Sequence, residues 1–538
     1  MFKCKQLLRR ICVVSYVFLL CGGLVNASNL VSKTNTLIGT QGNGWASGYL
    51  YPGATYPFGM VQFTPTYFTK QLGFVINQLS GAGCDHMGNF PTLPIAGALR
   101  VSPDSILNMQ TPVGKEIGTA GYYAATVDHS IRAELTVTER TGMARYTFSS
   151  KEKQGTVIIG GGVAATPIQV AAIKITGPHS CEGYAEGGAF CGIPTPYKVY
   201  FVAEFDADAE SFGTWKEERL HANHTFAEGS HSGVYFTFPL KEGNQAVQYK
   251  IGVSYVSVEN ARENLRVENP AWDFSAVRQA TQDKWNEYLG KIEVEGDNED
   301  RQMQFYTHLY RSLIHPNVCS DVNGEYMGAD SQVHKTARKF YTSFSNWDTY
   351  RTQTALIAML APEETSDIVM SHYLFAEQSG GGFPRWVLAN IETGVMQGDP
   401  TPILVANAYA FGARTYDPRT LLRTMRYGAE VPGANSQGVL TRPGLEQYLE
   451  KGYYDASILL EYTSSDFAIG RFALQACNDE PVCNWYTQRA MNWKNLFNKE
   501  TGWLQSRNED GSWKRYDADW RESTYKNYFW MVPYDLQG

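Results

Sequence analysis

The chain has 538 residues, 43% of them hydrophobic and 13% aromatic, and a formal net charge of −8. Single hydrophobic cores stop growing at roughly 250–300 residues, so this length predicts two domains. The acidic balance and the lack of a basic stripe argue against nucleic acid as a partner, because phosphate binding needs clustered Lys and Arg.

The N-terminal segment 1–27 has the pattern of a secretory signal peptide. Four basic residues precede an apolar run from Ile11 to Val25, and small residues follow at a suitable cleavage position. A membrane anchor is the alternative, but the run is shorter than the ~20 apolar residues that a spanning helix needs. We therefore predict export, to the periplasm or out of the cell, with no membrane span after cleavage.

Nine cysteines occur, and three of them lie in the segment 1–27. The other six are Cys84, Cys181, Cys191, Cys319, Cys477 and Cys483. An even number permits disulfides in an exported chain. The expected pairs are Cys181 with Cys191 and Cys477 with Cys483, because short loops bring their ends together at little entropic cost. No partner is predicted for Cys84 or Cys319.

The sequence pattern changes once along the chain. Short β-rich runs separated by Gly, Pro, Asn and Asp fill the range 28–270 and predict a β-sandwich. Apolar residues at helical spacing then predict a linker helix within 271–297. The pattern stays helical over 298–538, so the expected fold class is multi-domain, with an N-terminal β-sandwich followed by an all-α domain.

Helix start signals support the second domain, because proline stands in the first turn and Asp or Ser at the cap of several segments. Helices are predicted over residues 299–315, 349–359, 362–378, 402–414, 418–428, 464–477 and 480–498.

Three residues of the segment FSNWDTYR are candidates for binding a sugar. Trp347, Asp348 and Arg351 stand at the start of a predicted helix, where Asp348 and Arg351 can point the same way one turn apart. Sugars offer apolar C–H faces to rings and hydroxyls to polar groups, so this combination suits them. A capping acid with an i, i+3 ion pair is the structural alternative.

Glu522 stands among aromatic residues in the segment WRESTYKNYFW. A carboxylic acid among rings loses solvation of its charged form, so its pKa rises and it can hold a proton near neutral pH. A general acid requires that property, although a solvated glutamate at a helix start is the alternative. Weaker candidates for substrate contact are Trp386 in GGFPRW, and Cys84 and Asp85 in SGAGCDHMG.

Seven landmarks follow one another in order along the chain: GTQGNGWASGYLYPGATYPFGMVQFTP, SGAGC, AELTVTERTGMARYTF, QFYTHLYRSLIHP with SDVNGEY, FSNWDTYR, GGFPRW and the C-terminal pattern EX5YXWXVPXD. In this order and at this spacing they resemble glycoside hydrolase family 92 from about residue 35 to 538. The resemblance implies a β-sandwich followed by an (α/α)6 barrel, with the site between them. It also implies a calcium-dependent exo-α-mannosidase that inverts configuration, most often at α-1,2 linkages in mannose-containing glycans.

The resemblance also assigns roles to residues. Glu522 matches the general acid of the family, and the three candidates in FSNWDTYR match residues that face the terminal mannose. Two positions depart from the pattern: Ser523 stands where Gly is usual, and Tyr534 stands where His is usual before Asp535. Because Glu522 is kept, these departures bear on linkage preference more than on chemistry.

An inverting glycosidase needs a second carboxylate as base, roughly 6.5–9.5 Å from the acid. The family places this base in an Asp-Asp segment after the acid motif, so we expect it, and most calcium ligands, beyond Gly538. The predicted helices are fewer than an (α/α)6 barrel contains, so we expect the barrel to be incomplete here. A non-catalytic mannose-binding or glycan-binding fragment, or a gene remnant, is the alternative.

Overall fold

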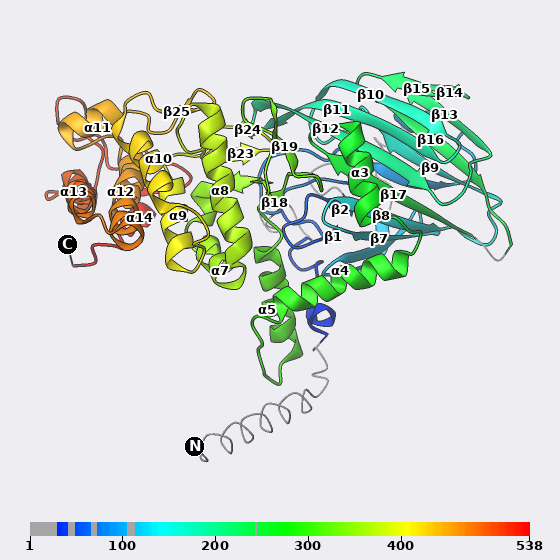
Figure 1. The fold of residues 1–538 in the computed structure, drawn as a ribbon, viewed down its shortest axis with the longest axis horizontal. Helices are drawn as coiled ribbons and strands as arrows, with labels where there is room; N and C mark the ends of the chain where they lie inside the picture. The colour runs from blue at the N-terminus through cyan, green and yellow to red at the C-terminus, as the bar shows by residue number, and fades with distance from the viewer. Residues whose placement is uncertain (1–28, 41–48, 66–72, 105–112, 243–244, 538) are drawn as a thin grey trace, which may run out of the picture.

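The computed structural model describes residues 29–40, 49–65, 73–104, 113–242 and 245–537. The predicted signal peptide and part of the motif GTQGNGWASG lie outside these residues. Within them, no helix combines the length and the apolar character needed to cross a bilayer. A β domain and a helical domain lie side by side, joined by three helices (Figure 1).

Two antiparallel sheets form the β domain in the described part of the chain. In neighbour order, the first comprises β1 (Ala54–Thr55), β2 (Gln62–Pro65), β3 (Phe74–Val75), β4 (Thr92–Ala96), β9 (Gln154–Gly160), β16 (Ser232–Pro239), β13 (Ser211–Lys216) and β14 (Arg219–Ala222). The second comprises β15 (Phe226–Glu228), β10 (Ile168–Gly177), β11 (Ser180–Phe190), β12 (Ile193–Phe205), β17 (Ala246–Ser254), β8 (Thr141–Thr147), β7 (Ile131–Val137), β6 (Tyr122–Val127) and β5 (Val113–Thr119). The two sheets share one apolar core.

Burial along the strands follows the period of two that a half-buried sheet requires. Most of β11 alternates between buried and more exposed positions, and so does much of β12. By contrast, β16 is buried over almost its whole length.

Three helices connect the domains: α3 (Val258–Glu268), α4 (Phe274–Leu289) and α5 (Glu299–Ser312). The first two cover one sheet, α3 against β12 and β17 and α4 against β7 and β8 (Figure 1). Side-chain caps start all three, at Ser257, Asp273 and Asn298. The strand-rich range expected up to residue 270 therefore ends in a helix, and α4 lies within the predicted linker 271–297.

The helical domain contains α6 (Asn346–Thr349), α7 (Gln353–Leu360), α8 (Pro362–Ser379), α9 (Thr401–Ala410), α10 (Pro418–Glu430), α11 (Leu445–Lys451), α12 (Ala456–Cys477), α13 (Glu480–Ala490), the 3-10 helix η3 (Met491–Leu496) and α14 (Tyr525–Tyr528). Short strands lie between α5 and α14. The pairs are β18 (Asn317–Val318) with β21 (Tyr341–Thr342), β19 (Glu325–Met327) with β20 (Val333–Lys335), β25 (Asn435–Ser436) with β26 (Val439–Leu440) and β27 (Phe497–Asn498) with β28 (Trp503–Leu504). A three-stranded sheet comprises β22 (Phe344–Ser345), β23 (Trp386–Leu388) and β24 (Ile391–Glu392). Another 3-10 helix, η1 (Leu30–Lys33), precedes the first strand.

An all-β domain followed by a helical domain is therefore confirmed. Proline marks the starts of α8 and α10 as predicted, and Asp417 caps α10 through the backbone N–H groups of Arg419 and Thr420. The (α/α)6 arrangement and its incompleteness stay predictions.

Helix α12 is the central element of the helical domain, with most of its residues buried. Its Asp466 is fully buried and accepts hydrogen bonds from Arg442 (2.8 Å), Arg489 (2.5 and 2.6 Å) and the Tyr448 hydroxyl (2.7 Å). Because these partners come from α11, α13 and the loop before α11, one buried carboxylate joins α12 to its neighbours.

The contact between the two domains is aromatic and buried. Trp285 of α4 donates its indole N–H to the Thr55 carbonyl of β1 (2.7 Å), and the Thr55 hydroxyl lies 2.7 Å from the Tyr310 hydroxyl of α5. All three residues are almost completely buried. Tyr51 and Phe58, which lie on either side of β1, therefore share one core with α4 and α5.

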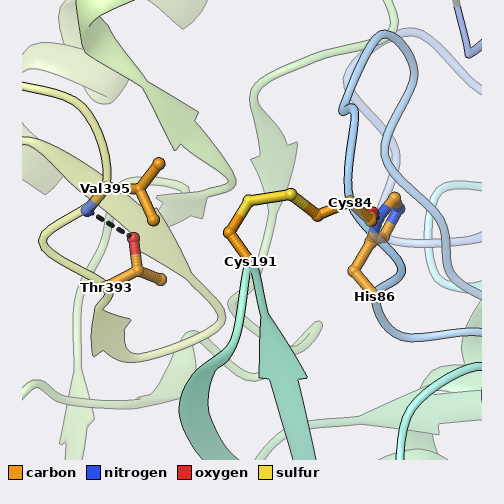
Figure 2. The surroundings of a disulfide bond; sticks show 5 residues. All are labelled: Cys84, His86, Cys191, Thr393 and Val395. Atoms are coloured by element: carbon orange, nitrogen blue, oxygen red, sulfur yellow. Dashed lines mark hydrogen bonds between the residues drawn. A yellow bond between two sulfur atoms is a disulfide. The ribbon is translucent and has the colours of Figure 1, made fainter. Parts of the chain in front are cut away.

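A disulfide joins Cys84 to Cys191, which lies in the tight turn between β11 and β12. Cys84 belongs to the loop 79–86, and the bond closes a segment of 107 residues. Figure 2 shows the loop that carries Thr393 and Val395, from the helical domain, in the surroundings of this bond. The disulfide therefore secures a β-domain loop close to the helical domain.

Both predicted disulfides are wrong. Cys181 and Cys191 lie at opposite ends of β11, and a strand of this length separates them by roughly 30 Å, far beyond the ~7 Å that a disulfide tolerates. Cys477 and Cys483 are free thiols on different helices, and Cys483 contacts Thr487 instead, with its sulfur 3.9 Å from the hydroxyl oxygen. Short sequence separation did not bring either pair into bonding geometry.

Replacing Cys84 with Ser should lower the free energy of unfolding of the β domain by roughly 3–5 kcal/mol, because closing a loop of this length restricts the unfolded chain. Chemical denaturation followed by intrinsic fluorescence measures the change. Cys477→Ser is the matched control, since this thiol is free and only half-buried. Equal effects of the two substitutions would contradict the assigned bond.

Candidate active site

The carboxylate of Glu461, on α12, meets two predicted site residues, Trp347 and Arg351, and also Tyr350, which was not among the predicted residues. The indole N–H of Trp347 donates to Oε1 (2.8 Å), and the hydroxyl of Tyr350 donates to Oε2 (3.1 Å). Arg351 approaches Oε1 through Nη2 at 3.4 Å. The segment 347–351 is therefore attached to α12 by one side chain.

Glu461 is completely buried, and this burial raises the pKa of its carboxyl group to about 7. Arg351 and the hydrogen bonds from Trp347 and Tyr350 act in the opposite direction and offset part of the rise. The carboxyl group of Glu461 is therefore titratable although it is completely buried, and it accepts hydrogen bonds from a single short segment.

Arg351 connects this anchor to the surface. Its guanidinium lies 4.8 Å from the ring centroids of both Trp347 and Tyr350, and 39% of its side chain is exposed. Arg351 Nη1 also lies 3.6 Å from the sulfur of Met531. A guanidinium held in this way keeps N–H groups available for hydroxyl oxygens.

Asp348 lies beside this group and reaches solvent. Desolvation by the surrounding protein raises the pKa of its carboxyl group, while a hydrogen bond from the Ser345 hydroxyl and the charge of Arg351 lower it. The charge of Glu522 raises it further. Asp348 and Glu522, which are distant in sequence, are thus electrostatic neighbours.

The segment that carries Glu522 is tied to α12 by a second polar chain. Ser457 of α12 donates to Gln397 Oε1 (3.0 Å), and Gln397 Nε2 donates to the Tyr528 hydroxyl (2.9 Å). Tyr528 in turn donates to the carbonyl of Arg521 (3.0 Å), which directly precedes Glu522. Residues one turn apart on α12 therefore hold both groups of predicted site residues.

The predicted environment of Glu522 is wrong in one respect. Its side chain is exposed rather than enclosed by rings, because the neighbouring aromatic residues pack on one another. Trp520 lies 5.2 Å from Tyr528, and Trp503 packs edge-on against Tyr525 and Phe529. The carboxylate therefore stands at an open edge of the site, accessible to a ligand.

Trp386 is not placed with these residues. It is 4% exposed and stacks on Phe190 of β11, with ring centroids 4.2 Å apart. Its backbone N–H bonds to the buried carboxylate of Glu392. A stacked and buried indole has little surface for a sugar, so this geometry favours a role in the joint between the domains.

Cys84 and Asp85 lie in the loop 79–86, where Asp85 is exposed. Two histidines, the buried His86 and the half-buried His315, hold this loop as hydrogen-bond acceptors: His86 Nε2 accepts from the N–H of Leu79 (2.7 Å), and His315 Nε2 accepts from the N–H of Ser80 (2.9 Å). Burial lowers the pKa of each histidine to about 4, which preserves their acceptor form. No hydrogen bond among the described residues joins Asp85 to Asp348 or Glu522.

The sequence interpretation does not include Glu461, because the helix it predicts begins only at residue 464. The structure starts α12 two turns earlier, at Ala456. One signal was present: Glu461 lies in the apolar stretch SILLEYTSSDFAIG, where a carboxylate is rarely buried without partners.

Calcium, which the resemblance implies, takes six to eight oxygen ligands, with carboxylates prominent among them. No group of three or more His, Cys, Asp and Glu side chains within the described ranges is arranged to hold a metal ion. Carboxylates within these ranges therefore form no calcium site by themselves, and no step below is routed through calcium.

Comparison with known proteins covers both domains. The model of the glycosyl hydrolase family 92 N-terminal domain matches residues 34–254, and that of the family 92 catalytic domain matches residues 260–538. The chain belongs to glycosyl hydrolase family 92. This family 92 protein is therefore a glycoside hydrolase, and a purely glycan-binding role is not favoured.

Relatives agree with this assignment. A family 92 α-mannosidase structure from Bacteroides thetaiotaomicron matches with a TM-score of 0.86 and 24% identity, over 95% of this chain and 72% of that chain. A family 92 inverting mannosidase from the same organism matches with a TM-score of 0.84 and 25% identity, over 94% and 71%. An uncharacterized secreted glycosidase of Arthroderma benhamiae is 24% identical over 94% of this chain and 71% of its own length.

Glu461→Gln should change how the stability of this family 92 chain depends on pH. A raised pKa means that the contribution of Glu461 is fully present below its unfolded-state pKa and is lost as pH rises to about 7. Since one unit of pKa corresponds to about 1.4 kcal/mol, the loss amounts to roughly 3 kcal/mol between about pH 4 and pH 8. Denaturant titrations of both proteins measure it, and a difference between them that is constant with pH would contradict the assignment.

Proposed function

We propose that this protein removes terminal α-linked mannose from glycans, with a preference for α-1,2 linkages and with inversion of configuration. The observation that carries the proposal is the convergence of the segments 347–351 and 521–528 on one face of α12. Charged and aromatic groups suited to a sugar thereby lie beside an accessible carboxylate. Family membership supplies the reaction class.

Glu522 is the general acid in this proposal. It donates its proton to the glycosidic oxygen as the bond from that oxygen to the anomeric carbon breaks, so the glycan leaves as a neutral alcohol. A water molecule attacks the anomeric carbon from the opposite face, transfers a proton to a general base and gives β-mannose. We assign no general base to a described residue.

A bound sugar would complete the environment that Glu522 lacks. Its exposed carboxylate lies near Asp348, and a ligand over both would exclude water. The same ligand would meet the ring of Trp347 and the guanidinium of Arg351.

The proposed substrates and location also draw on the relatives. One of the Bacteroides thetaiotaomicron α-mannosidase structures is described as a complex with mannoimidazole, and the fungal relative is described as secreted. Together with the predicted signal peptide, these descriptions support mannose-containing glycans as substrates and an exported enzyme, in the periplasm or outside the cell.

Proton NMR of the first turnovers tests both the linkage and the stereochemistry. With α-1,2-mannobiose we expect β-mannose to appear first and the α-anomer to follow by mutarotation, because single displacement inverts the anomeric carbon. The α-1,3, α-1,4 and α-1,6 isomers should react more slowly. Initial release of α-mannose would overturn inversion, and faster hydrolysis of another isomer would overturn the proposed preference.

Glu522→Gln tests the general acid. Hydrolysis of α-1,2-mannobiose should fall by about 10²–10⁴-fold, because a sugar alcohol leaves poorly without a proton. Hydrolysis of 2,4-dinitrophenyl α-mannoside should fall much less, since that leaving group needs no protonation. Glu509→Gln, at an exposed loop glutamate, is the control. Equal losses on both substrates would remove the assigned role.

A further inference from the structure

Three side-chain donors of one motif end on a single carboxylate. Within WDTYR, the indole, the phenol and the guanidinium all reach Glu461, which lies 110–114 residues further along the chain. Each of them acts as a donor, so an ionised carboxylate satisfies all three. These contacts determine the orientation of Trp347 and Arg351 from the buried side of the motif.

The arrangement does not serve stability well. A fully buried carboxylate loses its hydration, so a buried ion pair is weak evidence for a contribution to stability. Arg351 recovers only part of this cost, because its guanidinium is partly exposed and lies 3.4 Å away. The charge at Glu461 therefore has a purpose other than holding the fold.

The loop backbone at Gly398 packs closely against Glu461 and restricts its side chain. Gly398 has a φ of +78°, and a Cβ atom placed there would lie 2.6 Å from Cβ of Glu461 and 2.8 Å from its Cγ. The loop backbone thus packs directly against the side chain. Arg385 holds this loop through a hydrogen bond to the Gly398 carbonyl (3.0 Å).

We propose that Glu461 is a positioning residue that fixes the indole of Trp347 and the guanidinium of Arg351 in the orientation that binds the terminal sugar. This inference rests on the proposed function. Glutamine would have nearly the same shape: its oxygen could still accept from Trp347 and Arg351, and its NH₂ could donate to the Tyr350 hydroxyl. It would lack the charge that attracts the guanidinium, so the partly exposed Arg351 would be the first to move.

Steady-state kinetics of Glu461→Gln with an aryl α-mannoside test the inference. We expect kcat/KM to fall about 10- to 100-fold, because small displacements of binding groups have effects of this size. The melting temperature at pH 8 should be unchanged or higher. Glu461→Asp, which keeps the charge on a shorter side chain, should recover part of the activity.

Glu430→Gln is the matched control. Glu430 also accepts from an arginine, Arg426 Nε (2.7 Å), and from a tyrosine hydroxyl, Tyr486 (2.9 Å). None of its hydrogen-bond partners belongs to the proposed site. Its kcat/KM should stay within about twofold of the wild type, since exposed ion pairs contribute little.

A double-mutant cycle separates positioning from general support of the fold. If Glu461 acts through Arg351, adding Glu461→Gln to Arg351→Ala should lower kcat/KM by much less than it does in the wild type. Independent, additive losses would overturn the inference. A loss of activity that merely follows a lower melting temperature would also overturn it.

Crystal structures of the wild type and Glu461→Gln provide a readout that does not need catalysis. The inference requires Arg351 or Trp347 to move in the variant, and unchanged side chains would overturn it. If the side chains move but the wild-type protein hydrolyses no α-mannoside, the proposed function fails while the positioning of the motif stands. The two failures are therefore distinguishable.

Discussion

The burial of one negative charge on α12 is the constraint around which the proposed site is organised. Glu461 is completely buried, so its carboxylate must be satisfied by protein donors, and within the described part of the chain these come from the segment 347–351. One turn earlier, Ser457 starts the polar chain that leads to the Glu522 segment. Helix α12 therefore determines where the site residues lie, although those residues belong to other segments.

The same helix uses a second buried carboxylate for a different purpose. Burial tends to raise the pKa of Asp466, but the charges of Arg489 and Arg442 and the hydrogen bond from Tyr448 outweigh it and hold that pKa below the ordinary value. Glu461 has one partly exposed arginine, and its pKa is raised. Five residues apart on α12, one carboxylate joins helices and the other holds surface groups, and their titration behaviour reflects the difference.

Local signals account for the part of this protein that could be predicted from sequence. Pro362 and Pro418 marked helix starts because proline fits the first turn whatever surrounds it, and the spacing of apolar residues separated the two domains. Contacts made over long sequence separations could not be read in this way. Glu461 meets its partners across more than 100 residues, and the Cys84 bond spans 107. Proximity in sequence favoured the wrong cysteine pairs, since strand and helix geometry decides where each side chain lies.

The Cys84–Cys191 bond links the loop 79–86 to the β11–β12 turn, while His315 holds the same loop from the connection that follows α5. The second cysteine emerges from the ribosome long after the first, so this covalent link cannot form until most of the sandwich has been synthesised. A recombinant host that keeps thiols reduced would deliver a chain whose loop is held by hydrogen bonds alone. Whether the protein is produced in an oxidising or a reducing compartment therefore decides whether the domain junction that is studied contains this disulfide.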